Sequence, residues 1–413
     1  MNTPLDASDF VGRAAQLDQT DPLGRFAAEF VPSDEVVAYL DGNSLGRPLR
    51  VTGARFASFL EREWGGRLIR SWDEQWMDLP LALGDRIGAL TLGAAPGQTV
   101  VADSTTVLLY KLIRAAVGAR PGRTEIVVDD DNFPTDRFVL EGVAAECGLT
   151  LRWISVDKSR GVTVDQVRDA VSASTALVVL SHVAYRSGYL ADAQAITEEV
   201  HSAGALVLWD LCHSAGVVPT ELDEWGVDIA VGCTYKYLNG GPGSPAFAYL
   251  RRDLQDQLQQ PIWGWMGASD VFAMASEYRP AAGMRRFISG TPPVVGMLAM
   301  QDMLDLIERA GLGDIREKSL LLTDFALDVV DAWLAPLGVT VATPREPERR
   351  GSHLTIRHDS FRAVTAVLWA RGVIPDFRAP DGIRIGLSPL STTFAELLAG
   401  LAAIRHAMDP AAG

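Results

Sequence analysis

The sequence predicts an α/β protein, with a large domain on a mostly parallel sheet flanked by helices and a small α+β C-terminal domain. Two patterns lead to this prediction. From about residue 90, short apolar stretches alternate with helical ones, which is typical of βαβ crossovers. Beyond about residue 295, two long helical patterns precede short strands and further helices. We therefore expect an N-terminal arm, a large domain and a small domain, covering residues 1–50, 51–295 and 296–413.

The strands expected in the large domain are apolar runs, as strands buried on both faces of a parallel sheet usually are. A helical pattern over residues 193–203 separates two of them. The expected strands cover residues 125–129, 177–181, 205–210 and 228–231.

The C-terminal part mixes helical and strand patterns. Long helices are expected over residues 294–310 and 315–334, and shorter ones over 361–371 and 393–408. The strands expected between them cover residues 339–342, 352–357 and 382–386.

Composition narrows the class of protein. Of 413 residues, 48% are hydrophobic and 22% charged, which is typical of a globular chain. The net charge of −15 argues against nucleic acid or an anionic membrane surface as a partner, but not against a small anionic ligand. The scattered Cys147, Cys212 and Cys233 form no disulfide framework or metal motif. With no long apolar run and no secretory leader pattern, we expect a cytoplasmic protein.

The most informative stretch is residues 235–243, where Lys236 stands between an apolar run and a glycine-rich turn. Asp210 and His213 come earlier, at the end of another apolar run. A lone loop lysine is usually a solvated charge, but glycines that admit a bound group and a strand-end aspartate favour a site. The lysine amine would form a Schiff base with pyridoxal phosphate, and the aspartate would keep the pyridine nitrogen protonated. The sequence therefore predicts pyridoxal phosphate as cofactor.

Two further stretches are candidates for holding the cofactor. Residues 103–107 precede a helical pattern, and the hydroxyls of Thr105 and Thr106 with free amides there would form an anion site. An ordinary N-cap explains the same residues, so the phosphate assignment depends on the lysine. In the turn that follows the strand at 125–129, Phe133 could lie against the cofactor ring and Asp136 could accept a hydrogen bond.

Arginine and tryptophan residues suggest where a substrate binds. Arg384 lies in a predicted strand and could clamp a carboxylate with two parallel hydrogen bonds, although a surface ion pair is the alternative. Aromatic clusters are more often core than site. Trp265 is flanked by glycines, which fits a lining loop, and Trp64 is a weaker candidate of the same kind.

Together these motifs resemble the kynureninase family, pyridoxal-phosphate enzymes of fold type I, the aspartate-aminotransferase fold. The blocks around Asp41 and Lys236 carry most of the resemblance, and the matches keep the family's order over nearly the whole chain. The matching stretches are residues 40–46, 132–136, 209–216, 231–243, 290–293 and 372–378.

The resemblance implies roles for particular residues. Lys236 would carry the cofactor and move protons, and Arg384 would bind the α-carboxylate of a small amino-acid substrate. Asn43 and Ser44 would lie in the same substrate site, and Trp64 would line its aryl pocket. The resemblance also implies a homodimer whose neighbouring subunit contributes two of the cofactor contacts, Trp265 and Thr291. The cofactor contacts implied in all are Thr105, Thr106, Phe133, Asp136, Ser181, Asp210, His213, Tyr235, Lys236, Trp265 and Thr291.

The activity that the resemblance implies is hydrolytic cleavage of the Cβ–Cγ bond of L-kynurenine to anthranilate and L-alanine. Lys236, Tyr235 and Asp210 would be catalytic, with Tyr235 as the candidate proton donor to Cβ. A preference for 3-hydroxykynurenine or another ring-substituted kynurenine is the main alternative. Ala268, Pro375 and Ser391 depart from the family's pattern and bear on the aryl pocket or on domain closure.

Two other functions fit the sequence less well. A cysteine desulfurase of the same fold would need a catalytic cysteine on a mobile loop, and the three cysteines lie in or beside predicted elements. A cofactor-binding regulatory protein would need a DNA-binding module, for which the chain has no basic segment.

Overall fold

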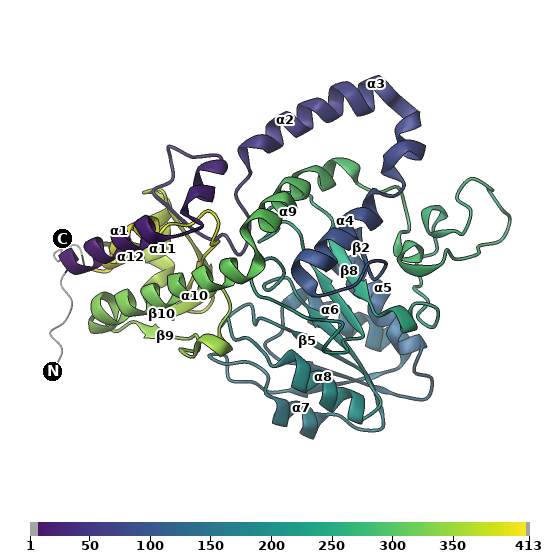
Figure 1. The fold of residues 1–413 in the computed structure, drawn as a ribbon. Helices are drawn as coiled ribbons and strands as arrows, with labels where there is room; N and C mark the ends of the chain where they lie inside the picture. The colour runs from purple at the N-terminus through teal and green to yellow at the C-terminus, as the bar shows by residue number, and fades with distance from the viewer. Residues whose placement is uncertain (1–6, 410–413) are drawn as a thin grey trace.

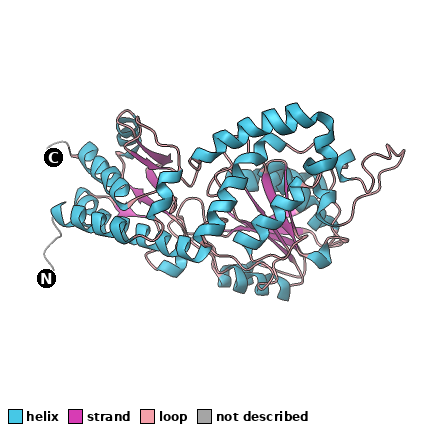
Figure 2. Cartoon of the chain, turned by 45° about the horizontal axis from the view of Figure 1, so that its top comes forward, coloured by secondary structure: helices cyan, strands magenta, loops and turns pink. Residues whose placement is uncertain are grey.

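The computed structural model describes residues 7–409, so the ends of the expected N-terminal arm and C-terminal domain lie outside the described part. The α/β class is confirmed. Figure 1 shows a larger body built around one sheet and a smaller body that carries both ends of the described chain. Figure 2 shows the strands of each body enclosed by helices.

The larger sheet has the strand order β2-β8-β7-β6-β5-β3-β4. Strand β8 runs antiparallel to both of its neighbours, whereas the pairs from β7 to β4 are all parallel. The four strands expected in the large domain are confirmed as β3, β5, β6 and β7. The bounds are β2 Thr99–Ala102, β3 Glu125–Asp129, β4 Thr150–Ile154, β5 Thr175–Ser181, β6 Leu206–Asp210, β7 Ile229–Gly232 and β8 Ala246–Leu250.

Helices cover both faces of this sheet because its strands are apolar on both sides. Val127 packs on the face covered by α4, α7, α8 and α9, whereas its neighbours Ile126 and Val128 pack on the face covered by α5 and α6. Helix α8 confirms the helix expected at 193–203. The bounds are α4 Leu79–Ile87, α5 Thr105–Gly118, α6 Pro134–Cys147, α7 Val164–Ala170, α8 Ala193–Ser202 and α9 Leu298–Ala310.

An arm of helix lies outside this core. Helix α2 (Arg50–Ser58) continues through a π-helical turn at Phe59–Trp64 into α3 (Gly65–Arg67). Its base is held to α9, because Thr52 and Arg55 both bind the Asp302 carboxylate, at 2.8 and 2.7 Å. The rest of the arm arches away from the larger body (Figure 1).

The smaller sheet has the order β1-β11-β12-β10-β9. Its first strand comes from the N-terminal segment and pairs in parallel with β11. The bounds are β1 Ala38–Leu40, β9 Thr340–Val341, β10 His353–Arg357, β11 Val373–Arg378 and β12 Gly382–Gly386, with helices α1 Ala7–Thr20, α10 Leu312–Val329, α11 Phe361–Trp369 and α12 Phe394–Met408.

The N-terminal segment shares the core of this smaller body. Phe10 of α1 meets Phe325 of α10 and Trp333 edge-on, with ring centroids 6.1 and 5.4 Å apart. Ala38 and Leu40 of β1 belong to the same buried cluster. Helix α1 and strand β1 therefore pack with the C-terminal part, whereas Leu23, Phe26 and Phe30 between them belong to the core of the larger body. The boundaries expected near residues 50 and 295 stay predictions.

The turn at residues 41–46 connects the two bodies. Asp41 forms a parallel bridge with Gly386, and the Gly46 amide donates to the Tyr235 carbonyl at 2.9 Å. A Cβ on Gly46 would lie 2.4 Å from the Lys236 carbonyl oxygen, so only glycine allows this approach. The turn is thereby held against the lysine loop.

Two kinds of feature are not found between residues 7 and 409. No helix there is long and apolar enough to cross a membrane. No group of three or more His, Cys, Asp or Glu side chains there is arranged to hold a metal ion.

Phe325 tests the smaller core. Its ring is fully buried and also meets Phe394 edge-on at 5.8 Å. We expect Phe325→Ala to lower the free energy of unfolding by about 3–5 kcal/mol through lost contacts and a cavity, measured by denaturant titration. Phe138, which is 65% exposed, is the matched control, and Phe138→Ala should change it by less than about 0.5 kcal/mol. Equal effects of the two substitutions would contradict this account of the core.

Candidate active site

One cavity of about 140 Å³ lies at the carboxyl edge of the larger sheet, beside the ends of β5, β6 and β7. Nine residues proposed from the sequence line it, together with Ser104, Thr135, Tyr185 and Cys212. The nine are Thr105, Thr106, Phe133, Asp136, Ser181, Asp210, His213, Tyr235 and Lys236.

Lys236 is the central amine of this cavity. It follows β7 on a tight loop in which the Asn239 amide donates to the Lys236 carbonyl at 3.0 Å. The side chain is only 8% exposed, and its Nζ lies 3.1 Å from His213 Nε2. The same nitrogen stands 5.8 Å from the centre of the Phe133 ring. A buried amine with so few partners is suited to covalent attachment of a ligand.

His213 is a buried, neutral partner for this amine. Burial, followed by the charge of Lys236, lowers the pKa of His213 well below its usual value. Its Nδ1 has no hydrogen-bond partner, and its ring lies 5.2 Å from that of His353, which comes from β10 of the smaller sheet. An unpartnered ring nitrogen in a cavity wall is a candidate contact for a bound group.

Two carboxyl groups face each other across the cavity wall. Asp210 ends β6, and its Oδ1 accepts a hydrogen bond from the Cys212 amide at 2.7 Å. Asp136 lies in the first turn of α6, and its Oδ2 has no partner. Burial, then the charge of Asp210, raises the pKa of Asp136 well above its usual value. This pair fits a bound ring with a protonated nitrogen, which would supply the missing donor.

The start of α5 forms one end of the cavity. Ser104 caps the helix by accepting from the Val107 amide at 3.4 Å, and Thr105 and Thr106 follow in the first turn. The N-cap explanation is therefore correct, but the remaining free amides and the helix dipole still favour an anion. Lys111, fully buried one turn on, braces this end by binding the Phe287 carbonyl at 2.8 Å.

Tyr235 is placed to keep a proton beside the lysine. Burial, followed by the neighbouring Cys233, raises the pKa of the Tyr235 phenol. Its ring centre lies 6.0 Å from Lys236 Nζ. The phenol therefore keeps its proton and can donate it only to a group that becomes strongly basic.

Arg384 is buried, so the alternative of a surface ion pair is wrong. Its side chain is 1% exposed, and Nη1 donates to the Tyr185 carbonyl at 2.8 Å. Nη2 donates to Ser44 Oγ at 2.7 Å and contacts Asp376 Oδ2 at 2.8 Å. The hydrogen bonds around the Asn43 side-chain amide are satisfied when its oxygen points toward Arg384 and accepts a hydrogen bond from Nε at 3.0 Å. The three residues proposed for the substrate carboxylate site thus form one cluster, attached to the cavity through Tyr185.

Three proposed residues do not reach this cavity. Trp64 on the helical arm and Trp265 on the loop between β8 and α9 are 54% and 45% exposed. Thr291 is also exposed. The arm and the loop both project from the body of the chain (Figures 1 and 2). Ala268, Pro375 and Ser391 do not line the cavity either.

Sequence reasoning missed two residues in or beside the wall of the cavity. Tyr185 lies in the loop after β5 and meets Phe133 edge-on at 5.3 Å. Its place just beyond a strand end, where ligands bind in such sheets, was the available signal. His353 comes from the other body of the molecule, and nothing in its local sequence indicates this position.

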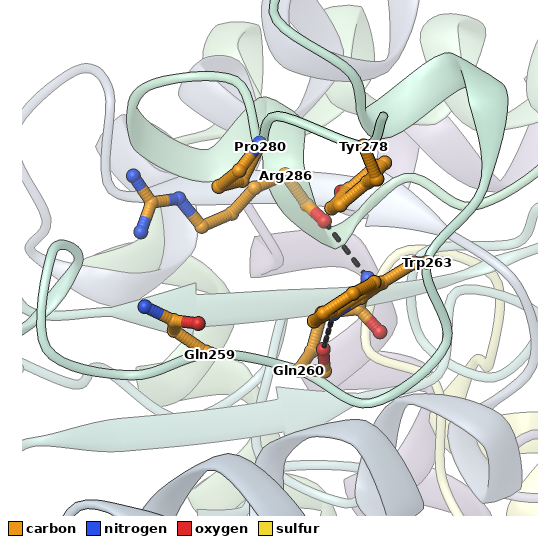
Figure 3. Close-up of a pocket in the computed structure, with 6 residues that line it drawn as sticks. All are labelled: Gln259, Gln260, Trp263, Tyr278, Pro280 and Arg286. Carbon is orange, nitrogen blue, oxygen red and sulfur yellow. Dashed lines mark hydrogen bonds between the residues drawn. The ribbon is translucent and has the colours of Figure 1, made fainter. Parts of the chain in front are cut away.

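A second cavity, of about 230 Å³, lies on the projecting loop and is not the cofactor site (Figure 3). Its polar groups bind one another: Gln260 Nε2 donates to the Arg286 carbonyl and Trp263 Nε1 to the Gln260 carbonyl, both at 3.1 Å. The Trp263 ring stacks on Tyr278. This network stabilises the loop that carries Trp265.

Solved structures share the fold. The chain matches a cysteine desulfurase from Escherichia coli with a TM-score of 0.79 and 18% identity, over 94% of this chain and 98% of that one. It matches a cystine C–S lyase in complex with cysteine persulfide with a TM-score of 0.77 and 18% identity, over 90% and 98%. At this identity the likeness concerns the fold alone.

Sequence relatives identify the family. A family model described as the kynureninase C-terminal domain matches residues 315–404. The chain is 42% identical over 389 residues to a kynureninase from Pseudomonas fluorescens, covering 92% of this chain and 91% of that protein. It is 39% identical over 401 residues to a kynureninase from Burkholderia pseudomallei (strain 1106a), covering 96% and 95%. The chain belongs to the kynureninase family of pyridoxal-phosphate-dependent hydrolases.

Proposed function

We propose that this enzyme hydrolyses the Cβ–Cγ bond of L-kynurenine, with one water consumed and anthranilate and L-alanine released. The observation that carries the proposal is the buried Lys236 amine, 3.1 Å from a neutral His213 and in one cavity with Asp210. The high identity to relatives named kynureninase supports the substrate class.

The cavity residues fit pyridoxal phosphate. The start of α5 would hold its phosphate, Phe133 and His213 would lie against its ring, and Asp210 with Asp136 would hold its ring nitrogen. When bound, pyridoxal phosphate supplies an electron-withdrawing ring that stabilises negative charge on the attached amino acid.

The chain's own residues then have distinct tasks. Arg384 would fix the α-carboxylate, and so the orientation of the substrate's Cα–H bond. The Lys236 amine would move the proton at Cα, since it is the basic group of the cavity wall. Tyr235, whose raised pKa keeps its phenol protonated, would deliver a proton to Cβ.

We also propose a homodimer with shared active sites. Large apolar side chains are exposed on the helical arm and on the projecting loop, and such surfaces mark interaction sites. Because Trp64, Trp265 and Thr291 stay outside the cavity of their own chain, a second copy would bring these residues to the site. The exposed apolar residues of the two segments are Val51, Leu60, Trp64, Leu68, Ile69, Ile262, Trp263, Trp265, Phe272, Met274 and Val295.

The substrate proposal predicts that the purified, cofactor-loaded enzyme releases alanine from L-kynurenine with a higher kcat/KM than from 3-hydroxy-L-kynurenine. One ring hydroxyl changes binding in an aryl pocket by about 1–3 kcal/mol, so the ratio should lie between about 5 and 200. Alanine release by steady-state kinetics is the measurement. A preference for the hydroxylated substrate would move the assignment to a 3-hydroxykynureninase, and no release from either would refute the substrate class.

Substitutions of Lys236 and Tyr235 should distinguish cofactor attachment from proton transfer. We expect Lys236→Ala to lose both turnover and the yellow absorbance of covalently attached cofactor. Tyr235→Phe should keep the absorbance but lower kcat by about 100-fold or more, because the proton donor is lost. Visible absorption spectra and single-turnover kinetics check both expectations. An active, colourless Lys236→Ala enzyme would refute the attachment site.

Mixing two inactive variants tests the shared site. Lys236→Ala and Trp265→Ala homodimers should each be impaired, and the mixture should regain about a quarter of wild-type activity after subunit exchange, because half the dimers then contain one intact site. Size-exclusion chromatography with light scattering follows the oligomeric state. A monomeric, fully active enzyme, or a dimer without recovery on exchange, would contradict shared sites.

A further inference from the structure

Three charged side chains of the smaller sheet meet at the proposed carboxylate site. Asp376 on β11 stands directly opposite Arg384 on β12, and its Oδ2 contacts Arg384 Nη2 at 2.8 Å. Arg378, two residues further along β11, binds the same oxygen through Nε at 2.6 Å. One carboxylate oxygen of the protein thus lies between two guanidinium groups.

More than half of the hydrogens of Arg384 are used. A guanidinium has five N–H donors. Within residues 7–409, Nε donates to Asn43, one Nη1 hydrogen to the Tyr185 carbonyl and one Nη2 hydrogen to Ser44, while Asp376 Oδ2 lies 2.8 Å from Nη2 as an ion-pair contact. One hydrogen is left on Nη1 and one on Nη2. A substrate carboxylate bound by two parallel hydrogen bonds needs both of them, so the carboxylate that already lies against Nη2 has to move away.

The contact to be released is the one with Asp376. A substrate carboxylate beside Arg384 would be repelled by a second carboxylate held on the same nitrogen, whereas the neutral Ser44 hydroxyl causes no such repulsion. Asp41 is farther away, with its Oδ1 at 3.9 Å from Nη2. Arg378 is already bound to Asp376, so the displaced aspartate keeps a cationic partner.

We propose that Asp376 occupies, in the free enzyme, the place at Arg384 that the substrate α-carboxylate takes on binding, and that Arg378 retains Asp376 during this exchange. The inference rests on the proposed role of Arg384 as the carboxylate ligand. Asp376 is then a specificity determinant, because a ligand without a carboxylate cannot replace it. Because Asp376 competes with the substrate for Arg384, the Michaelis constant is higher than it would be without this contact.

Asp376→Asn tests the exchange, because it keeps the shape of the side chain and removes its charge. Removing the charge weakens the contact of this side chain with Arg384 by about 1 kcal/mol, so we expect the KM for L-kynurenine and the inhibition constant of L-alanine to fall about fivefold. The dissociation constant of the decarboxylated amine analogue of kynurenine should not change. Arg378→Gln should raise the KM, since Asp376 then depends on Arg384 alone, and this increase should vanish in the double variant.

The outcomes separate this inference from the proposed function. A KM that rises or stays the same in Asp376→Asn, with the yellow absorbance retained, would overturn the exchange. Arg384→Lys should raise the KM in either case. If Arg384→Lys leaves the KM unchanged, Arg384 is not the carboxylate ligand, and the premise of the inference fails with it.

Discussion

The parallel pairing of β6 with β7 is the interaction on which the rest of the site depends. It sets Asp210 beside Val231 at the same edge of the sheet, so that the loop after β7 brings Lys236 to the residues that follow Asp210. Parallel strands direct their carboxyl ends to one edge, and β5 adds Ser181 and Tyr185 there by the same rule. Because these strands are buried on both faces, a shift in their register would bury the wrong side chains, and the apolar core therefore stabilises the relative positions of the reactive groups.

A second constraint joins the two bodies of the molecule. The turn at residues 41–46 touches the lysine loop at Gly46 and the smaller sheet at Gly386, while Arg384 reaches from that sheet to the Tyr185 carbonyl in the loop after β5. Any movement of the smaller body relative to the larger sheet would consequently move Arg384 relative to Lys236. The proposed substrate carboxylate site and the proposed cofactor site would be coupled through a few polar contacts, and Asp376 contacts Arg384, which makes one of them.

An element or a site residue could be predicted from the sequence where neighbouring residues determine it, and not where distant contacts do. The strands β3, β5, β6 and β7 were predictable because burial makes each a continuous apolar run, whereas the edge strand β4 is mostly exposed, with only Ile154 buried, and was missed. Strand β1 was missed because its three residues pair with β11, more than 300 positions later. The cofactor residues follow strand ends and carry local signals. His353 and Asp376 do not, since only the packing of one body against the other gives them their positions.

The proposed cofactor site is built from one continuous part of the chain. The proposed substrate site combines residues from distant parts of the chain and, in the proposed dimer, from two chains. The cavity beside Lys236 is lined by residues between 104 and 236, which come from strand ends, loops and helix starts at one edge of the larger sheet. The substrate carboxylate site combines an N-terminal turn with a C-terminal strand, and the proposed aryl contacts come from an arm and a loop that their own chain leaves exposed. Solved structures share the fold at below 20% identity. In the proposed dimer, the parts that distinguish substrates would therefore be those held by contacts between bodies and between subunits, where small changes would alter the substrate site without disturbing the cofactor.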